Sequence, residues 1–472
     1  MIFPRLPWLT CKTLGIRPIY IMDIEPSARS ESEERVKRVM ILGAAGRDFH
    51  NFNTVYKDSK DHTVVAFTAA QIPGIANRTF PADLAGPQYP HGIPIFPEDQ
   101  LPSLIRQHHA DLVVLSYSDL SYQEVVHKAS IALAAGADFE LLGPKSTMLH
   151  SRLPVVSVGA IRTGAGKSTV SRKVSEILRH HGKRVAIIRH PMPYGDLAKE
   201  AVQRFATTQD LDRNECSIEE REEYDPHIAN GFVVFAGIDY QRILDLAEKE
   251  ADIILWDGGN NDIPFIKPNV HFAVLDPFRP GHELNHYPSE VNVLIADAAV
   301  INKVNTADPK NVELVESNLK QLNPKATVIK AASEITLDKP NLVKGQRVLV
   351  IEDGPTVTHG DMPYGVGFIA AKQFHASEIV DPRRHAVGII KETYAKYPHL
   401  TQVLPTMGYG EQQIHDLEKS IAGVDCDTIM IATPADIRHL VKLPKPTVRV
   451  TYELKEMPGP SIETVLQKAT II

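Results

Sequence analysis

Residues 155–169, VVSVGAIRTGAGKST, constrain the fold more than any other stretch of this sequence. Three valines among the first four residues predict a buried strand, and a helical pattern follows over residues 170–179. The glycines between them let backbone N–H groups close around a phosphate, and a lysine can reach the outer phosphates. Strand, glycine-rich turn and helix in this order predict a P-loop. The residues predicted to bind the nucleotide are Gly164, Ala165, Gly166, Lys167, Ser168 and Thr169.

The loop departs from the usual pattern at one position and carries an additional basic residue. Ile161 stands where a glycine is expected, and Arg162 lies five residues before Lys167. Arg162 is similar in position to a second basic residue of the SIMIBI class of P-loop proteins, which includes the ParA/MinD ATPases and dethiobiotin synthetase. We therefore predict that Lys167 and Arg162 are both catalytic cations directed at phosphate. The alternative for Arg162 is a solvent-exposed loop arginine.

Composition places the chain among ordinary globular proteins of two or three domains. It has 472 residues, of which 43% are apolar and 23% charged, and its net charge is −7. No basic stripe or membrane-length apolar run stands out, so we expect no nucleic acid and no membrane as partners. The three cysteines are far apart, which favours a reducing, cytoplasmic setting. Residues 1–35 lack a signal-peptide pattern and are expected to form a disordered tail or an upstream start of the reading frame.

Strands alternating with helical patterns predict an α/β fold with mainly parallel sheets. Residues 36–150 form the first predicted domain, in which a glycine turn at residues 43–46 resembles a Rossmann-type loop. The turn lacks G-x-G-x-x-G, so we expect a Rossmann-like domain without a dinucleotide, and NAD-dependent redox chemistry is a weaker alternative. A P-loop NTPase domain is predicted over residues 151–340, and a C-terminal α/β portion over residues 341–472.

Two further strand ends carry candidate nucleotide-site residues. Asp257 follows the apolar strand at residues 252–256, where a Walker-B carboxylate would hold Mg²⁺ or its water. We therefore assign Asp257 to catalysis and, with Ser168, to the metal; a turn aspartate is the alternative. Asn302, Lys303 and Asn305 resemble the base-reading N-K-x-D motif, with an amide in place of its aspartate. They predict base contact without guanine specificity, so the nucleotide is ATP or GTP.

Polar loops at other strand ends supply candidate substrate residues. Arginine and histidine side chains suit an anionic substrate. A metal site of the type H-x-x-x-H is disfavoured, because Pro280 and Pro288 interrupt any helix there. The predicted substrate residues are His190, Tyr194, Asp196, Arg279, His282 and Glu290.

Several motifs together resemble one family over residues 36 to 454. They are GRDFHNFN, RTGAGKS, RHPMPYGDL, ILWDGGNND, DPFRPGHEL, INKVN, VIEDGPTVTHG and PTMGYGEQQ. They look like the cyclic 2,3-diphosphoglycerate synthetase-like proteins, also called predicted GTPases. The resemblance implies ATP-driven closure of a phosphoanhydride in 2,3-diphosphoglycerate, which yields the cyclic product, ADP and phosphate. We thus expect a synthetase that uses ATP (or GTP) and Mg²⁺, takes a small anionic phosphorylated substrate and forms a homodimer. A regulatory GTPase or ATPase without a small-molecule product is the alternative.

Overall fold

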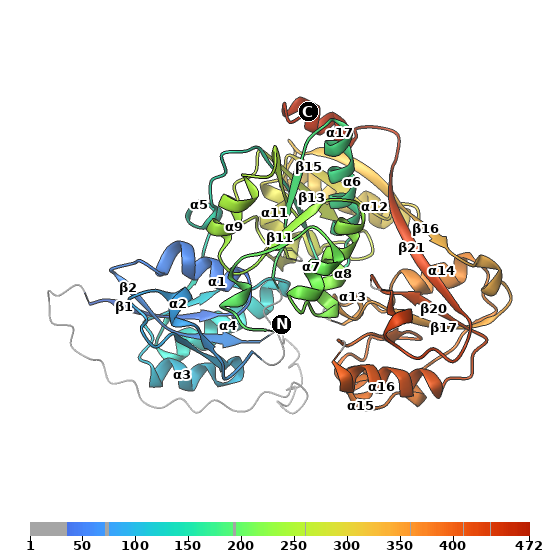
Figure 1. The fold of residues 1–472 in the computed structure, drawn as a ribbon, viewed down its shortest axis with the longest axis horizontal. Helices are drawn as coiled ribbons and strands as arrows, with labels where there is room; N and C mark the ends of the chain where they lie inside the picture. Colours follow the sequence, from blue (N-terminus) through green and yellow to red (C-terminus); the bar gives the residue numbers. More distant parts are fainter. Residues whose placement is uncertain are drawn as a thin grey trace, which may run out of the picture. The chain divides into compact units, whose positions relative to one another are not determined.

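The computed structural model describes residues 35–472, apart from residues 71–74, 192–194, 260, 359, 409 and 435. The tail predicted over residues 1–35 lies, but for its last residue, outside this range, and Val36–Ile472 forms one compact unit. Among the described residues, the strands form a six-stranded sheet, a thirteen-stranded sheet and a two-stranded pair (Figure 1). Most neighbouring strands of the two large sheets are parallel. The predicted α/β class is therefore confirmed.

The six-stranded sheet belongs to the N-terminal part and has the order β3-β4-β2-β1-β5-β7. Along β1, Val39 and Ile41 face one apolar cluster while Met40 and Leu42 face another, as alternation in a strand covered on both sides requires. The strands are β1 (Lys37–Leu42), β2 (His62–Ala69), β3 (Thr79–Phe80), β4 (Ile93–Pro97), β5 (Leu112–Leu115) and β7 (Asp138–Leu141). The helices of this part are α1 (Arg47–Asn51), α2 (Ala82–Ala85), α3 (Leu101–Gln107), α4 (Tyr122–Ala135) and α5 (Pro144–Thr147).

The thirteen-stranded sheet begins with the P-loop part, in the order β10-β11-β9-β12-β8-β13-β15-β16. Helix α6 packs Val170, Val174 and Leu178 against Val156 and Val158 of β8, which explains the apolar spacing of its sequence. The strands are β8 (Val155–Ala160), β9 (Val185–Ile188), β10 (Gln203–Phe205), β11 (Val233–Ala236), β12 (Ile253–Trp256), β13 (Val270–Leu275), β15 (Ala298–Ile301) and β16 (Thr327–Leu337). The helices are α6 (Lys167–His180), α7 (Thr208–Arg213), α8 (Ile218–Ala229), α9 (Tyr240–Ala247), α10 (His282–Asn285), α11 (Ser289–Leu294) and α12 (Pro309–Leu322).

The C-terminal part continues the same sheet. Strand β21 pairs antiparallel with β16 and parallel with β20, so the sheet runs on as β21-β20-β17-β18, while β19 also pairs with β17 (Figure 1). These strands are β17 (Arg347–Glu352), β18 (Glu378–Ile379), β19 (Leu404–Pro405), β20 (Thr428–Ala432) and β21 (Thr447–Glu456). The helices are α13 (Gly354–Val357), α14 (Val366–Gln373), α15 (Gly388–Lys396), α16 (Glu411–Ala422) and α17 (Ile462–Lys468).

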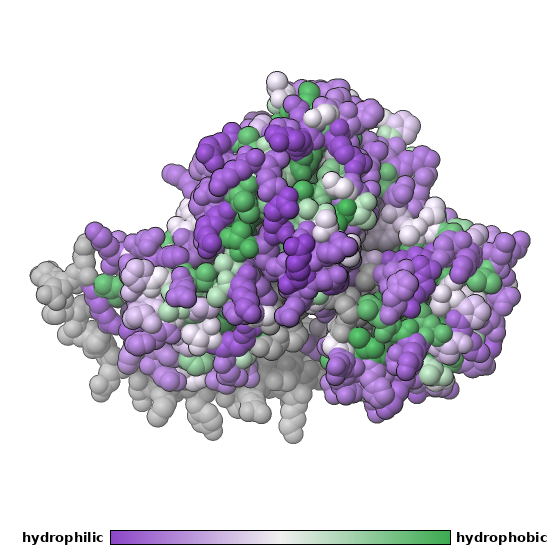
Figure 2. All heavy atoms as spheres, viewed as in Figure 1, coloured by the Kyte–Doolittle hydropathy of each residue, from purple (hydrophilic) through white to green (hydrophobic). Residues whose placement is uncertain are grey.

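The predicted boundary at residue 341 thus divides two groups of strands that share one continuous sheet. Helix α17 returns to the P-loop part, where Ile462, Val465 and Leu466 join the core that covers α6. A short antiparallel pair, β6 (Leu120–Ser121) with β14 (His286–Tyr287), links the N-terminal part to the P-loop part. The surface in Figure 2 is mostly hydrophilic, and hydrophobic side chains gather in the region of β17 and β20.

Candidate active site

The P-loop has the conformation that its sequence predicts. Gly164 and Gly166 have positive φ values of 80° and 101°, which glycine adopts without strain. A Cβ atom on Gly166 would lie 2.1 Å from Nδ2 of Asn302, which donates to the Ala165 carbonyl at 3.0 Å. Lys303 Nζ donates to the Gly164 carbonyl at 2.6 Å. The predicted nucleotide residues Asn302 and Lys303 therefore hold the P-loop through hydrogen bonds to its backbone carbonyls.

Lys167, the first residue of α6, is held by the loop that follows β12. Its Nζ donates to Asp257 Oδ1 at 2.7 Å and to the Gly258 carbonyl at 2.9 Å. Burial and the nearby Arg189 lower the pKa of Lys167 to about 8, although Asp257 opposes that shift. Asp257 thus forms an ion pair with Lys167, and the phosphates of a nucleotide would compete for the lysine.

The Asp257 carboxylate is fully buried and accepts from three further side chains. Arg189 Nη1 lies 2.6 Å and His227 Nε2 3.0 Å from its Oδ2 atom, and the Ser171 hydroxyl donates to Oδ1 at 2.5 Å. Although burial opposes it, Arg189 and Lys167 hold the pKa of Asp257 well below its usual range. Because its oxygens are already occupied, Asp257 would reach a metal by releasing a donor or through a water molecule.

A cleft with a volume of about 670 Å³ opens beside the P-loop. Its walls come from all three parts of the compact unit: the turn after β1, the P-loop with the loop after β12, and the loops after β17 and β19. The carboxyl ends of parallel strands meet at this cleft, as expected of a ligand site in an α/β sheet. Among the predicted site residues, those that line it are Arg162, Gly164, Gly166, Lys167, Ser168, His190, Asn302 and Lys303.

Oxygen donors that fit Mg²⁺ are present at the cleft. Ser168 and Asp262 both line it, and Asp262 lies in the same loop as Asp257. The Asp262 carboxylate is 3.4 Å from Nε2 of His190 and 3.6 Å from Nε of Arg47. Both distances are longer than a good hydrogen bond. Ser168 and Asp257 remain the predicted metal residues, with Asp262 as a second carboxylate within the same cleft. Among the described residues, no cluster of three or more histidine, cysteine or acidic side chains has the geometry of a metal site.

Arg162 joins the three parts of the chain. Its Nε donates to Asp119 after β5 at 2.5 Å, and its Nη2 donates to Asp361 of the C-terminal part at 2.9 Å. Nη1 lies 2.8 Å from Nδ1 of His282 and 2.6 Å from Nε2 of His286. Arg162 is only 2% exposed, so the expectation of a solvent-exposed arginine is wrong. It lines the cleft from within this cluster, and its predicted catalytic role stays a prediction.

Burial, followed by Arg162, lowers the pKa of His282 to about 4 and that of His286 to about 3. Both rings are thus neutral near pH 7 and can accept a hydrogen bond from the guanidinium. Their stacking, with centroids 4.1 Å apart, fixes the two acceptors side by side. His282, predicted as a substrate residue, therefore positions Arg162 in this structure.

The other predicted substrate residues lie in different surroundings. Arg279 is buried behind the P-loop, where it donates to Asp276 and to the Thr163 carbonyl at 2.8 Å. Asp196 is exposed and accepts from the Ala198 N–H at 3.0 Å. Glu290 accepts from the Tyr122 hydroxyl. Tyr194 lies outside the described residues, so among the described members of the predicted set only His190 lines the cleft.

The side-chain amide of Asn305 both donates and accepts a hydrogen bond. Its Nδ2 donates to the Ser333 carbonyl at 3.0 Å, and its Oδ1 accepts from the Ser333 N–H at 2.9 Å. An aspartate could make only the second of these bonds. The amide therefore ties the loop after β15 to β16, and its predicted contact with the base would require these bonds to open.

Besides Asp262, three buried acidic residues of the cleft are absent from the predicted site: Asp48, Asp119 and Glu352. Burial, followed by Asp262, raises the pKa of Asp48 to about 7, although backbone N–H groups oppose the shift. Burial raises the pKa of Glu352 to about 8, despite hydrogen bonds from Gly365 and Phe368 N–H. Each lies at or just beyond the end of a buried strand, and that position is the signal from which they could have been found.

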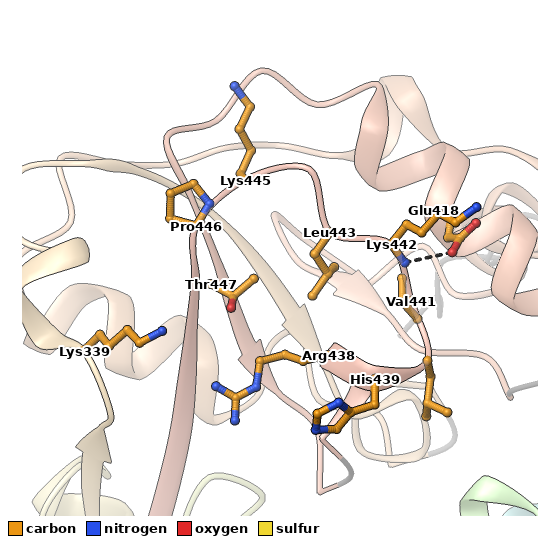
Figure 3. Close-up of a pocket in the computed structure, with 11 residues that line it drawn as sticks. Lys339, Glu418, Arg438, His439, Val441, Lys442, Leu443, Lys445, Pro446 and Thr447 are labelled. Carbon is orange, nitrogen blue, oxygen red and sulfur yellow. Dashed lines mark hydrogen bonds between the residues drawn. The ribbon is translucent and has the colours of Figure 1, made fainter.

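A separate hollow of about 720 Å³ lies in the C-terminal part (Figure 3). It shares no lining residue with the cleft, and no predicted site residue borders it. The charged side chains around it are Lys339, Glu418, Arg438, Lys442 and Lys445.

A glycine loop with positive φ angles, a lysine at the start of the next helix and a buried aspartate at the end of a neighbouring strand define a P-loop nucleotide-dependent enzyme. Comparison with known proteins agrees with this class. Arginine synthetase ArcE from Thermococcus kodakarensis is 57% identical over 437 residues, which are 93% of this chain and 98% of the relative. The chain belongs to the family of this arginine synthetase. The expectation of a P-loop synthetase is thus confirmed, whereas the relative does not carry the name of a cyclic 2,3-diphosphoglycerate synthetase.

No protein-family model matches the chain. Among solved structures, LpxK from Aquifex aeolicus in complex with ATP has a TM-score of 0.40 at 12% identity, covering 78% of this chain and 99% of its own. The hydrogenase maturation factor HypB from Archaeoglobus fulgidus has a TM-score of 0.24 at 18% identity, covering 38% of this chain and 80% of its own. In the described part of the chain, no helix has both the length and the apolar character needed to cross a bilayer.

Proposed function

We propose that this chain is an ATP-dependent synthetase that forms arginine. The observation that carries the proposal is the identity of 57% with an arginine synthetase across 98% of that relative's length. The cleft supports it, because a P-loop lysine, candidate magnesium ligands and several carboxylates line the same cleft. ATP, Mg²⁺, a cytoplasmic setting and a homodimer are parts of this proposal.

The chemistry that fits is activation of a ureido oxygen. The guanidino group of arginine differs from the ureido group of citrulline by one nitrogen in place of one oxygen. Transfer of the γ-phosphoryl group of ATP to that oxygen makes a leaving group, and ammonia then displaces phosphate at the carbon. Citrulline, ammonia and ATP thus give arginine, ADP and phosphate.

The role of the chain in this reaction is to hold charge and position. Lys167 would leave Asp257 and contact the outer phosphates, where its charge stabilises the transferring phosphoryl group. Mg²⁺, when bound near Ser168 and Asp257, would neutralise phosphate charge. The buried Arg162, braced by Asp119 and Asp361, would keep the P-loop fixed against the other two walls of the cleft.

The charge of the cleft favours arginine formation over the cyclic 2,3-diphosphoglycerate reaction. Eight aspartate and glutamate side chains line it against six lysine and arginine side chains. Since burial raises the pKa of Asp48 to about 7 and that of Glu352 to about 8, the charges of the two signs nearly balance before a nucleotide binds. The nucleotide phosphates would form ion pairs with some of those cations. The surface that remains for the second substrate is then acidic. A zwitterionic amino acid and an ammonium ion suit such a surface better than a bisphosphate.

Product analysis tests the proposal against its alternatives. The purified protein is incubated with Mg²⁺ and either ATP or GTP, together with citrulline plus ammonium or with 2,3-diphosphoglycerate. We expect arginine and ADP in equal amounts from the first substrate pair and no cyclic product from the second. Cyclic 2,3-diphosphoglycerate would support the alternative synthetase, and nucleotide hydrolysis without either product would support a regulatory NTPase.

A further inference from the structure

Arg47 is a buried cation at the cleft whose hydrogen-bonding capacity is only partly used. It begins α1, directly after the turn that ends β1, and is only 2% exposed. Its Nη2 donates to the Ile263 carbonyl, and its guanidinium lies 4.9 Å from the centre of the Phe265 ring. Within the described part of the chain, its Nε and Nη1 atoms make no hydrogen bond.

Buried charged donors without an acceptor are costly, so two free N–H groups on one guanidinium indicate an acceptor that arrives with a ligand. The Asp262 carboxylate does not fill this role, because its oxygen stands 3.6 Å from Nε. Nε and Nη1 lie on either side of Nη2, so a carboxylate would bind one edge of the guanidinium and take one of the free donors together with the remaining N–H of Nη2. Arg47 is among the residues that line the cleft. Because its Nε and Nη1 atoms are buried, a ligand contacts them when the side chains in front of them move.

Two carboxylates lie beside this guanidinium. Asp48 is the next residue in the chain, and Asp262 forms an ion pair with Arg47; both line the cleft. Both carboxylates are buried, at 3% and 5% exposure, so an arriving cation would find two acidic groups already held at the cleft. One guanidinium and two carboxylates together complement a group that carries both a negative and a positive charge.

The place in the fold also fits a second substrate. In the N-terminal sheet, β1 is followed on one side by β2 and on the other by β5, so the order of strands reverses there. Ligands of α/β sheets bind at the carboxyl ends of the strands at such a point. Lys167 and Asp262 line the same cleft as Arg47, and the charge of Asp262 acts on both Lys167 and Asp48. A molecule bound at Arg47 would therefore share the cleft with the lysine of the P-loop.

The geometry points to Arg47 as the residue that binds the α-carboxylate of an amino-acid substrate, with Asp48 and Asp262 facing its α-ammonium group. This assignment rests on the proposed function and adds the substrate class. The N-terminal Rossmann-like part then serves as the amino-acid site of the enzyme. A phosphate group of a phosphoglycerate is the other anion that Arg47 could bind, and the experiment separates the two.

The test removes the carboxylate from the substrate and the guanidinium from the protein. Steady-state constants are measured for Arg47→Gln and wild type with citrulline and with its decarboxylated analogue, N-carbamoylputrescine. We expect Arg47→Gln to raise the KM for citrulline about 10- to 100-fold, as loss of hydrogen bonds to a charged group predicts. The KM for the analogue and the KM for ATP should change by less than about 3-fold. Arg106→Gln, at an exposed arginine of α3, is the matched control and should behave as wild type.

The outcomes separate this inference from the proposed function. Arginine formation with equal selectivity in wild type and Arg47→Gln would overturn the inference and leave the function standing. If wild type forms no arginine, calorimetric titration with arginine, citrulline and 2,3-diphosphoglycerate decides. Amino-acid binding that Arg47→Gln abolishes supports the inference, whereas binding of the bisphosphate alone overturns it. Arg47→Lys, which keeps the charge, covers the case in which Arg47→Gln does not fold, and should show an intermediate KM.

Discussion

Replacing Asp257 by asparagine should weaken the protein most when no nucleotide is bound. The carboxylate is fully buried and accepts from Lys167, Arg189, His227 and Ser171. Asparagine keeps the shape but removes the charge, which leaves two buried cations without their shared partner. Breaking a buried ion pair in this way costs about 3–5 kcal/mol.

The size of the effect can be converted to a melting temperature. Unfolding entropy is about 2.1 cal/mol/K per residue, which gives roughly 0.9 kcal/mol/K for a unit of roughly 440 residues. A loss of 3–5 kcal/mol then lowers Tm by about 3–6 °C. Bound ATP gives Lys167 a new anionic partner, so the difference between mutant and wild type should shrink when nucleotide is added.

Scanning calorimetry of both proteins, with and without ATP, measures these quantities. Asp252→Asn is the matched control. Asp252 lies just before β12 and forms an exposed ion pair with Arg184, so its substitution should change Tm little. In activity assays, Asp257→Asn should also weaken the dependence on Mg²⁺ more than the affinity for nucleotide. An unchanged Tm in Asp257→Asn would refute the view that this carboxylate holds the two cations. Loss of the metal requirement in Asp262→Asn instead would assign the metal role to Asp262.

Three further changes test other parts of the account. Lys167→Ala should lower nucleotide turnover by about two to three orders of magnitude in a folded protein, and near-normal turnover would remove the P-loop assignment. Asn305→Asp loses the hydrogen bond that the Asn305 amide donates to the Ser333 carbonyl, so we expect the free energy of unfolding in denaturant to fall by about 1 kcal/mol. The ratio of ATP to GTP use should stay unchanged. A shift towards GTP would instead show that this side chain faces the base. Burial raises the pKa of Glu352 from its usual 4.5 to about 8, so its favourable contribution is present at low pH and is lost as pH rises through that interval. Glu352→Gln should therefore gain stability over wild type between pH 5 and pH 9, by an amount on the order of a few kcal/mol, and equal pH profiles would contradict the assigned burial.

The parts of the site that the sequence predicts are those fixed by short-range rules. The P-loop could be predicted because its glycines, its lysine and the apolar pattern of α6 act within some fifteen residues. Asp257 could be predicted because it directly follows a short apolar strand. The α/β class likewise follows from local alternation of strands and helices.

The surroundings of Arg162 and Arg47 depend on contacts that no local pattern encodes. Arg162 meets Asp119 and Asp361, which come from two other parts of the chain. The free donors of Arg47 become visible only when the buried atoms around its guanidinium are known. The pairing of β16 with β21, which makes one sheet of two groups of strands, joins residues more than a hundred positions apart.

The fate of the ureido oxygen shows whether ATP activates citrulline. Citrulline labelled with ¹⁸O in its ureido group is incubated with the protein, Mg²⁺, ATP and ammonium, and the released phosphate is analysed by mass spectrometry. If ATP phosphorylates that oxygen, one ¹⁸O atom appears in inorganic phosphate for each arginine formed, and Lys167→Ala forms neither product. Phosphate released without the label, or ATP hydrolysis without arginine, would contradict the account.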